Sequence, residues 1–392
     1  MVAKLTGDLL LSRRAFLIGC SVAASPLLTP VTFAAVPGDN RLVVIVLRGA
    51  MDGIDVVRPT GDAAYASLRP TLAAAQGPAL TDFFTLHPDA AGLMPLWTAG
   101  ELGFAHAVAT PYRSGRSHFI GQDALENGTG TSDGNLTPGH DGWLNRALSL
   151  MPAARADTAV SVGQQRLLIL DGAHQTDHWF PVSESPLSAQ GLDLLNAVNA
   201  ADPLFAEPYA QAQSLARSMN GEQAPKGGQA YAQLGSYVAE RLTGPSRIAS
   251  FSFGGWDTHH NQAKTMTDQL TALTQVLVAL KTGLARAWGT TLVLAMTEFG
   301  RTARENGSEG TDHGTGGMAI LSGGALKGGR VFGAWPGLSE ANLLANRDVM
   351  PTADVRSYPG WALRMMFGLN ATGLQSSVFP GLDLGPNPGF LL

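Results

Sequence analysis

The sequence predicts an α/β fold in which helices cover both faces of a mostly parallel sheet. Short apolar runs rich in β-branched residues recur along the chain, and such runs are typical of strands buried on both faces of a parallel sheet. Amphipathic helical patterns separate these runs, and strands that alternate with helices indicate this fold class. With 392 residues, 45% of them hydrophobic, the chain is long enough to bury a full core.

The expected strands and helices follow one another along the chain. The apolar runs lie at residues 42–47, 105–109, 247–253, 291–296 and 318–321. The helical patterns lie at residues 89–97, 119–127, 262–288 and 353–367. Ligands of such sheets bind beyond the carboxyl ends of the strands, so polar residues at those ends are the first candidates for function.

One α/β domain is expected over residues 35–392, with an insertion around residues 150–245. The segment 206–230 is poor in strand signal and ends in a Gly-containing loop at 219–228. Polar motifs at strand ends occur on both sides of this segment and resemble halves of one site. We therefore interpret it as the edge of an insertion and not as a domain boundary.

The first 34 residues resemble a twin-arginine (Tat) export signal. Arg13 and Arg14 precede a weakly apolar run that ends in small residues at 32–34, where a signal peptidase would cut. Pro26 and Pro30 interrupt the run, which is too short for a membrane span of ~20 apolar residues. These features predict a periplasmic or secreted protein whose partner during export is the Tat translocase.

Composition and short motifs argue against several other classes. A lipoprotein cut before Cys20 would leave too short an apolar region, and no later stretch is long enough to predict a transmembrane span in the mature chain. A single cysteine excludes a disulfide framework. The net charge of −5, the pI of about 6.0 and the lack of a long basic run argue against nucleic-acid binding. A small anionic substrate would require local positive charge or a metal.

Two polar clusters lie in the first half of the chain. Asp52 follows the strand expected at 42–47 in a Gly-flanked turn, where a carboxylate suits a metal ligand; a turn Asp bonded to local N–H groups is the alternative. Ser117 precedes the helix expected at 119–127, where its hydroxyl would lie at the positive helix end beside Arg116. Ser117 is therefore a candidate nucleophile, with a helix cap as the alternative.

A third cluster follows the strand expected at 247–253. Asp257, His259 and His260 lie within a Gly-opened loop between this strand and the next helix. Carboxylate and imidazole groups at this spacing are typical of metal ligands, and an Asp cap with solvated histidines is the alternative.

The last two clusters lie around the final two expected strands. Glu298 follows one strand, and Asp312 with His313 precedes the other in a Gly-rich loop, where a local Asx turn is the alternative. Four strand-end loops thus each supply a carboxylate in a chain that is only 15% charged. This concentration predicts that the loops converge on one site.

The motifs, in this order, resemble the bacterial domain of unknown function 1501 family over essentially the whole mature chain. They are Leu47-Arg48-Gly49 with Asp52-Gly53, Arg116-Ser117-His118-Phe119, Asp257-Thr258-His259 with Gln262, Glu298-Phe299-Gly300-Arg301 and Asp312-His313-Gly314-Thr315. That family is grouped with the alkaline phosphatase and sulfatase superfamily. The resemblance implies a three-layer α/β/α sandwich, alkaline phosphatase-like, with a metal site at the strand ends. It also implies a nucleophile at Ser117 and metal ligands at Asp52, Asp257, His259, Asp312 and His313.

Two functions are compatible with these residues. One is an exported metal-dependent hydrolase of phosphate or sulfate esters with a metal-activated Ser or water, in which Arg116 holds a substrate oxygen and His118 orients the hydroxyl or the leaving group. The other is a non-catalytic, metal-containing protein of the same fold that serves the envelope or binds carbohydrate or a partner. One or two divalent ions are expected, Zn, Mn or Fe before Ca, because carboxylates and imidazoles are mixed. Glu298 and His260 are expected as further ligands or as neighbours of ligands.

Overall fold

The computed structural model describes residues 38–135, 141–163, 166–179 and 228–392. The predicted export signal therefore lies outside the described residues. None of the helices in the described ranges has the length and apolar character that crossing a bilayer requires.

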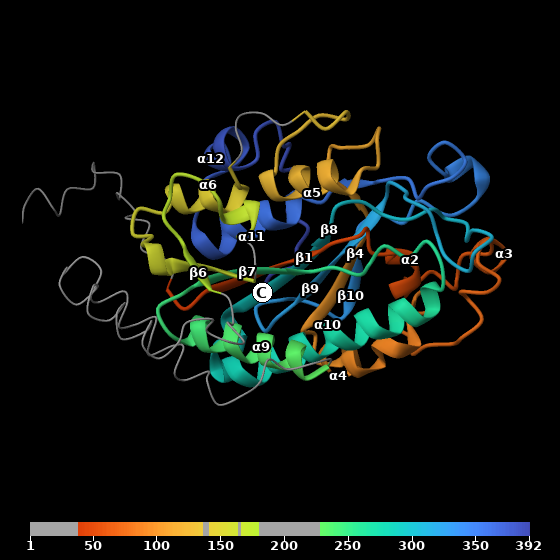
Figure 1. Ribbon diagram of the computed structural model, residues 1–392, viewed down its shortest axis with the longest axis horizontal. Helices are drawn as coiled ribbons and strands as arrows, with labels where there is room; N and C mark the ends of the chain where they lie inside the picture. Colours follow the sequence, from red (N-terminus) through yellow and green to blue (C-terminus); the bar gives the residue numbers. More distant parts are fainter. Residues whose placement is uncertain (1–37, 136–140, 164–165, 180–227) are drawn as a thin grey trace, which may run out of the picture.

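A nine-stranded sheet forms the centre of the fold (Figure 1). Its strands are β1 (Arg41–Leu47), β4 (Leu102–Ala109), β5 (Ala159–Val162), β6 (Asp177–Trp179), β7 (Ile248–Phe253), β8 (Thr291–Thr297), β9 (Gly317–Ser322), β10 (Arg330–Phe332) and β11 (Ala353–Asp354). The order across the sheet is β10-β4-β9-β8-β1-β7-β5-β6, and β11 pairs with β4. All of these pairings are parallel except those of β9 with β4 and β8. A separate two-stranded sheet joins β2 (Val57–Arg58) and β3 (Thr85–Leu86).

Helices cover both faces of the sheet. Figure 1 places α5 (His118–Asn127), α6 (Trp143–Ser149), α11 (Ser357–Phe367) and α12 (Ala371–Gly373) on one side. On the other side lie α4 (Met94–Thr98), α9 (Gly228–Thr243) and α10 (Gln262–Leu284). Two short helices, α2 (Gly53–Val56) and α3 (Tyr65–Leu68), follow β1 and flank β2.

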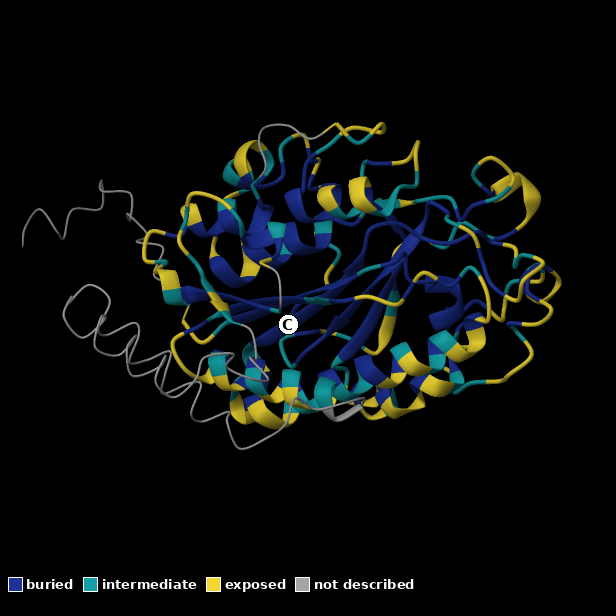
Figure 2. Ribbon diagram, viewed as in Figure 1, coloured by how far each residue is buried: buried dark blue, intermediate teal, exposed yellow. Residues whose placement is uncertain are grey.

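Strand β1 shows why the sheet lies in the middle. Its residues alternate between two separate hydrophobic cores, one shared with α6 and α11 and the other with α9 and α10. Both sets are fully buried, and Figure 2 shows the strands dark blue between half-exposed helices. The three-layer α/β/α prediction is therefore confirmed.

Two local predictions differ from the structure. The helix expected at 353–367 begins only at Ser357, because Ala353–Asp354 pairs with β4 as β11. The Asp354 carboxylate accepts a hydrogen bond from the Arg356 backbone N–H at 2.9 Å, so the chain turns between the strand and the helix. The helix expected at 262–288 ends as an α-helix at Leu284 and continues as a 3₁₀ segment, Ala285–Thr290.

The region of the predicted insertion contributes to the main fold. Strands β5 and β6 extend the central sheet beyond β7, and α9 packs along α10. Residues 180–227, which make up much of the predicted insertion, lie outside the described ranges.

Candidate metal centre

The ends of three neighbouring parallel strands define the place of the site. Leu47 at the end of β1 lies opposite Phe253 of β7 on one side and Thr297 of β8 on the other. The loops that follow these strands therefore leave the sheet at the same edge. The Gly49 N–H, in the loop after β1, donates to Glu298 Oε1, in the loop after β8, at 2.9 Å.

Gly49 is required by this close approach. Its φ is +116°, and a Cβ at this position would lie 2.6 Å from the backbone nitrogen of Asp257. A side chain here would push the loop after β1 away from the loop after β7.

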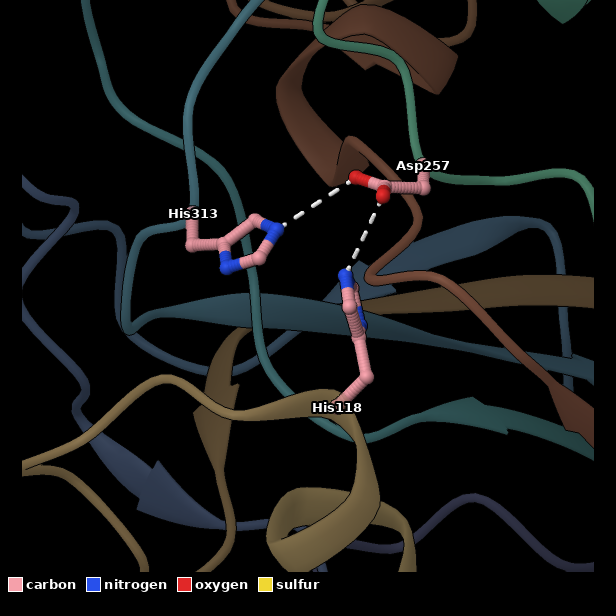
Figure 3. Close-up of side chains that lie close together, drawn as sticks. All are labelled: His118, Asp257 and His313. Atoms are coloured by element: carbon pink, nitrogen blue, oxygen red, sulfur yellow. Dashed lines mark hydrogen bonds and ion pairs between the residues drawn. The ribbon is translucent and has the colours of Figure 1, made fainter.

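Three side chains from distant segments meet at this edge (Figure 3). His118 Nε2, at the start of α5, lies 3.4 Å from Asp257 Oδ2 in the loop after β7. His313 Nε2, before β9, lies 3.3 Å from Asp257 Oδ1. The ligand atoms of all three lie within 4.8 Å of one another, which makes them a possible metal site.

His259 joins this group. Its Nε2 atom lies 3.2 Å from Asp257 Oδ1 and 2.9 Å from His313 Nε2. We call His118, Asp257, His259 and His313 the His/Asp cluster.

The Nδ1 atom of every histidine in the cluster faces an acceptor. That of His118 lies 2.8 Å from Glu298 Oε1, that of His313 lies 2.8 Å from the Arg116 carbonyl oxygen, and that of His259 lies 3.2 Å from Asp312 Oδ1. An acceptor at Nδ1 holds the proton there, so the neutral ring presents its Nε2 lone pair to the cluster. The Nε2 atom of His118 is buried and has no hydrogen-bond partner in the described part of the chain.

These positions fit a divalent ion. Four ligands bound tetrahedrally to zinc at roughly 2.0–2.1 Å lie about 3.3 Å apart, close to the contacts that Asp257 makes with the three rings. Two Nε2 lone pairs at the 2.9 Å separation of His259 and His313 repel each other unless a proton or a cation lies between them. A cation held by His118, Asp257 and His313 would satisfy the unpartnered Nε2 of His118.

Hydrogen bonds determine the pKa of the buried Glu298 carboxyl group. Burial favours the neutral acid, but hydrogen bonds from His118 and Gln122 and from the Gly49 N–H outweigh it and lower the pKa of Glu298. The hydrogen bond to Glu298 raises the pKa of His118, with burial acting in the opposite direction. The buried carboxylate thus increases the basicity of this imidazole, which strengthens it as a metal ligand.

The pKa values of Asp257 and His313 are lowered, whereas that of His118 is raised. Burial would raise the pKa of Asp257, but the hydrogen bond and the positive charge of Arg301 outweigh it and lower that pKa. Burial, followed by the charge of His118, lowers the pKa of His313. At neutral pH, Asp257 is therefore ionised and His313 is neutral, as metal ligands must be.

Arg301 holds the loops of the site together; it belongs to the Glu298-Phe299-Gly300-Arg301 motif, but no role was predicted for it. Its buried guanidinium donates to the carbonyl oxygens of Gly49, Ala50, Trp256 and Thr311 and to Asp257 Oδ1. These acceptors come from the loops after β1 and β7 and from the segment before β9. Arg301 lies three residues after Glu298 at the end of the same strand, and this position could have indicated that it belongs to the site.

The predicted catalytic residues lie around the start of α5. Ser117 is the N-cap residue, but its hydroxyl makes no capping hydrogen bond. Arg116 donates from Nη2 to Asp348 Oδ2 at 2.8 Å, while its Nε is buried without a hydrogen-bond partner in the described ranges. His118 lies in the His/Asp cluster, although orienting a hydroxyl or a leaving group was its expected role.

Four of the predicted ligands lie outside the cluster: Glu298 and Asp312 contact its rings, whereas Asp52 and His260 do not. Asp52 is buried and forms an ion pair with Arg69 at 2.6 Å, and it also accepts from Gln262 at 2.7 Å. Both contacts are made by Oδ2, and the buried Oδ1 atom has no hydrogen-bond partner in the described ranges. His260 is exposed, and in the described part of the chain no hydrogen bond or ion pair links it or Asp52 to the cluster.

Comparisons with known proteins give a family and distant fold relatives. Residues 97–360 match the family described as "Protein of unknown function (DUF1501)". Among curated proteins, none matches the sequence.

Among solved structures, Ps i-CgsB is 12% identical with a TM-score of 0.42, over 89% of this chain and 77% of that chain. The PsFucS1 sulfatase from Pseudoalteromonas sp. is 12% identical with a TM-score of 0.41, over 90% and 73%. The TAB5 alkaline phosphatase mutant with Mg bound in its M3 site is 12% identical with a TM-score of 0.31, over 73% and 91%. These low scores say nothing about what this chain binds or cleaves.

Proposed function

The chain belongs to the DUF1501 family of proteins of unknown function, and we propose that it is an exported metal-dependent hydrolase of phosphate or sulfate esters. The His/Asp cluster is the observation that carries this proposal. The ligand atoms of His118, Asp257 and His313 lie within 4.8 Å of one another, and His259 contacts two of these residues. The Nδ1 atom of each ring faces an acceptor. Imidazole with carboxylate favours Zn, Mn or Fe over Ca.

His118, Asp257 and His313, with His259 beside them, would hold a divalent ion, whose positive charge would lower the pKa of a hydroxyl or a water and offset the charge of the transferred group. Glu298 and Asp312 orient two of the rings through their Nδ1 atoms. Arg301 fixes the Asp257 carboxylate and keeps it ionised.

The start of α5 provides the other groups that the reaction requires. The hydroxyl of Ser117 is free of a capping bond and lies at the positive end of a ten-residue helix, which favours an anionic group beside it. The partly exposed guanidinium of Arg116, the residue before Ser117, would hold a substrate oxygen. Attack by water forms a new bond to phosphorus or sulfur as the bond to the ester oxygen breaks, and the proton that the water loses is taken up by the departing alcohol. Attack by Ser117 instead forms a phosphorylated or sulfated Ser117 with the same proton transfer, and a second attack by water releases phosphate or sulfate and restores the hydroxyl.

The test combines metal analysis with an ester panel. The full chain is loaded separately with Zn²⁺, Mn²⁺ and Fe²⁺, and bound metal and hydrolysis of phosphomonoesters, phosphodiesters and sulfate esters are measured. About one ion per chain and hydrolysis of at least one ester class are expected. Asp257→Asn should lose both, whereas the exposed Asp268→Asn on α10 should lose neither.

The outcomes separate the candidate functions. Hydrolysis that is unchanged by Asp257→Asn would overturn the proposal. Metal binding without hydrolysis of any ester would favour the non-catalytic, metal-containing protein. Loss of turnover in Ser117→Ala with metal retained would assign the attack to Ser117, and retained turnover would assign it to water.

A further inference from the structure

A cavity of about 450 Å³ lies next to the His/Asp cluster. Its walls come from α3, from the segment between β8 and β9, and from the loop around residues 338–347. Its size is within the range of small-molecule sites. Its polar lining includes Arg304, Asp312, Glu340, Asn346 and Arg347.

Asp312 connects the cavity to the cluster. Its carboxylate lines the cavity, and its Oδ1 atom lies 3.2 Å from Nδ1 of His259. Asn306, also in the lining, donates to the same oxygen at 3.3 Å and to the His259 carbonyl at 2.9 Å. A molecule in the cavity therefore lies one side chain away from a proposed metal ligand.

Several polar groups of the lining are not used by the protein itself. Within the described ranges, no hydrogen bond or ion pair involves the side chain of Arg304, Glu340 or Asn346. Arg347 donates only from Nη1, to Asp348 Oδ1 at 2.9 Å. Glu305, by contrast, is satisfied by the backbone N–H groups of Thr71 and Leu72. The cavity thus offers free donors and free acceptors together.

This combination determines which group fits. An apolar or aryl group would cover charged side chains without replacing their hydrogen bonds, which is unfavourable. A second anionic group would meet Arg304 and Arg347 but also the carboxylates of Asp312 and Glu340. A hydroxyl both donates and accepts, so a group with several hydroxyls satisfies both kinds of partner. Leu68, Leu338 and Leu343 provide an apolar surface for its carbon atoms.

We infer that this cavity binds the alcohol portion of the ester, and that this portion is a saccharide or a similar polyol. This inference rests on the proposed hydrolase function. It makes the cavity a selectivity site for saccharide phosphates or sulfates over aryl esters of the same acids.

Kinetics on paired substrates test the inference. The full chain, loaded with the metal that supports turnover, is assayed with galactose 4-sulfate and glucose 6-phosphate against 4-nitrophenyl sulfate and 4-nitrophenyl phosphate. The saccharide ester of the acid that is hydrolysed should have the higher kcat/KM. Arg304→Gln and Asn346→Ala should raise its KM at least about tenfold while kcat changes much less. Arg286→Gln, at an exposed position of the 3₁₀ segment after α10, is the matched control.

Equal or higher kcat/KM for the aryl ester, or a KM in Arg304→Gln equal to that of Arg286→Gln, would overturn the inference while leaving the hydrolase proposal in place. If no ester is hydrolysed, saturation-transfer NMR with galactose tests separately whether the cavity binds a saccharide. A galactose signal that Arg304→Gln abolishes and Arg286→Gln retains would support the cavity as a saccharide site even though the hydrolase proposal had failed. No galactose signal would reject the cavity as well.

Discussion

Nδ1 of His118 lies 2.8 Å from Oε1 of Glu298, although 180 residues separate the two in the chain. Glu298 is fully buried, and its carboxylate also accepts from the Gly49 N–H and the Gln122 amide. The pair combines two functions: it fixes the tautomer of the ring and increases the basicity of the Nε2 atom that faces Asp257.

Glu298→Gln should weaken metal binding about 10- to 100-fold, because the amide cannot supply the negative charge behind the ring. Competition with a chelator measures the metal affinity. Glu309→Gln, on an exposed residue between β8 and β9, is the matched control. A change below about threefold in Glu298→Gln, in protein that is still folded, would contradict the role given to this carboxylate.

Metal should stabilise the folded chain, because the cluster exists only when its loops are assembled. Zn²⁺ at 100 times its dissociation constant would add about 2.7 kcal/mol to the free energy of unfolding, and the melting temperature should rise accordingly. His313→Ala should remove this rise, whereas His260→Ala should keep it. Melting curves with Zn²⁺ and with a chelator give the comparison. An equal rise in both variants would place the metal elsewhere.

Arg301→Lys should destabilise the fold by about 3 kcal/mol or more, because an ammonium group cannot reach the carbonyls that the guanidinium bridges and several acceptors remain unsatisfied in the interior. Urea unfolding measures the loss. The exposed Arg286→Lys should change the free energy of unfolding by less than about 0.5 kcal/mol. Similar midpoints for the two variants would show that the loops do not depend on Arg301.

Stability should decrease between pH 6.5 and pH 4 in part because of His106. Burial lowers the pKa of this histidine from 6.5 to about 4, so in this range the unfolded chain binds a proton that the folded chain does not. The free energy of unfolding therefore rises with pH across the range, by about 3 kcal/mol from this residue.

His106→Gln should remove this part of the pH dependence, and His260→Gln should not. The measurement is the difference in the free energy of unfolding between each variant and the parent chain at several pH values. A difference for His106→Gln that stays constant from pH 4 to pH 6.5 would show that His106 is protonated in the folded chain.

Replacement of Arg13 and Arg14 by lysine should prevent export, because the predicted twin-arginine signal depends on this pair. Cell fractionation of a bacterial host with a Tat system should then find the chain in the cytoplasm, whereas the parent chain should reach the periplasm or the medium. Lys4→Arg is a control near the same end of the chain. Export of the double variant at the parental level would contradict the predicted route.

The sequence by itself determined the layers of the fold. The run at 42–47 is apolar at every position, which is typical of a strand buried on both faces. It also indicated where polar groups would gather, since the ends of parallel strands lie at one edge. Asp257, His259 and His313 were singled out in this way, and the structure brings them together.

Only the tertiary structure decided which partner each group has. Asp52, which the sequence predicted as a ligand, forms an ion pair through Oδ2 with the buried Arg69. His118 faces Asp257, and Arg301 bridges three loops, through contacts between residues far apart in the chain. The direction of β9 was not predicted either. Local patterns record whether a residue is buried, whereas charge pairing and coordination depend on distances that arise only when distant segments pack.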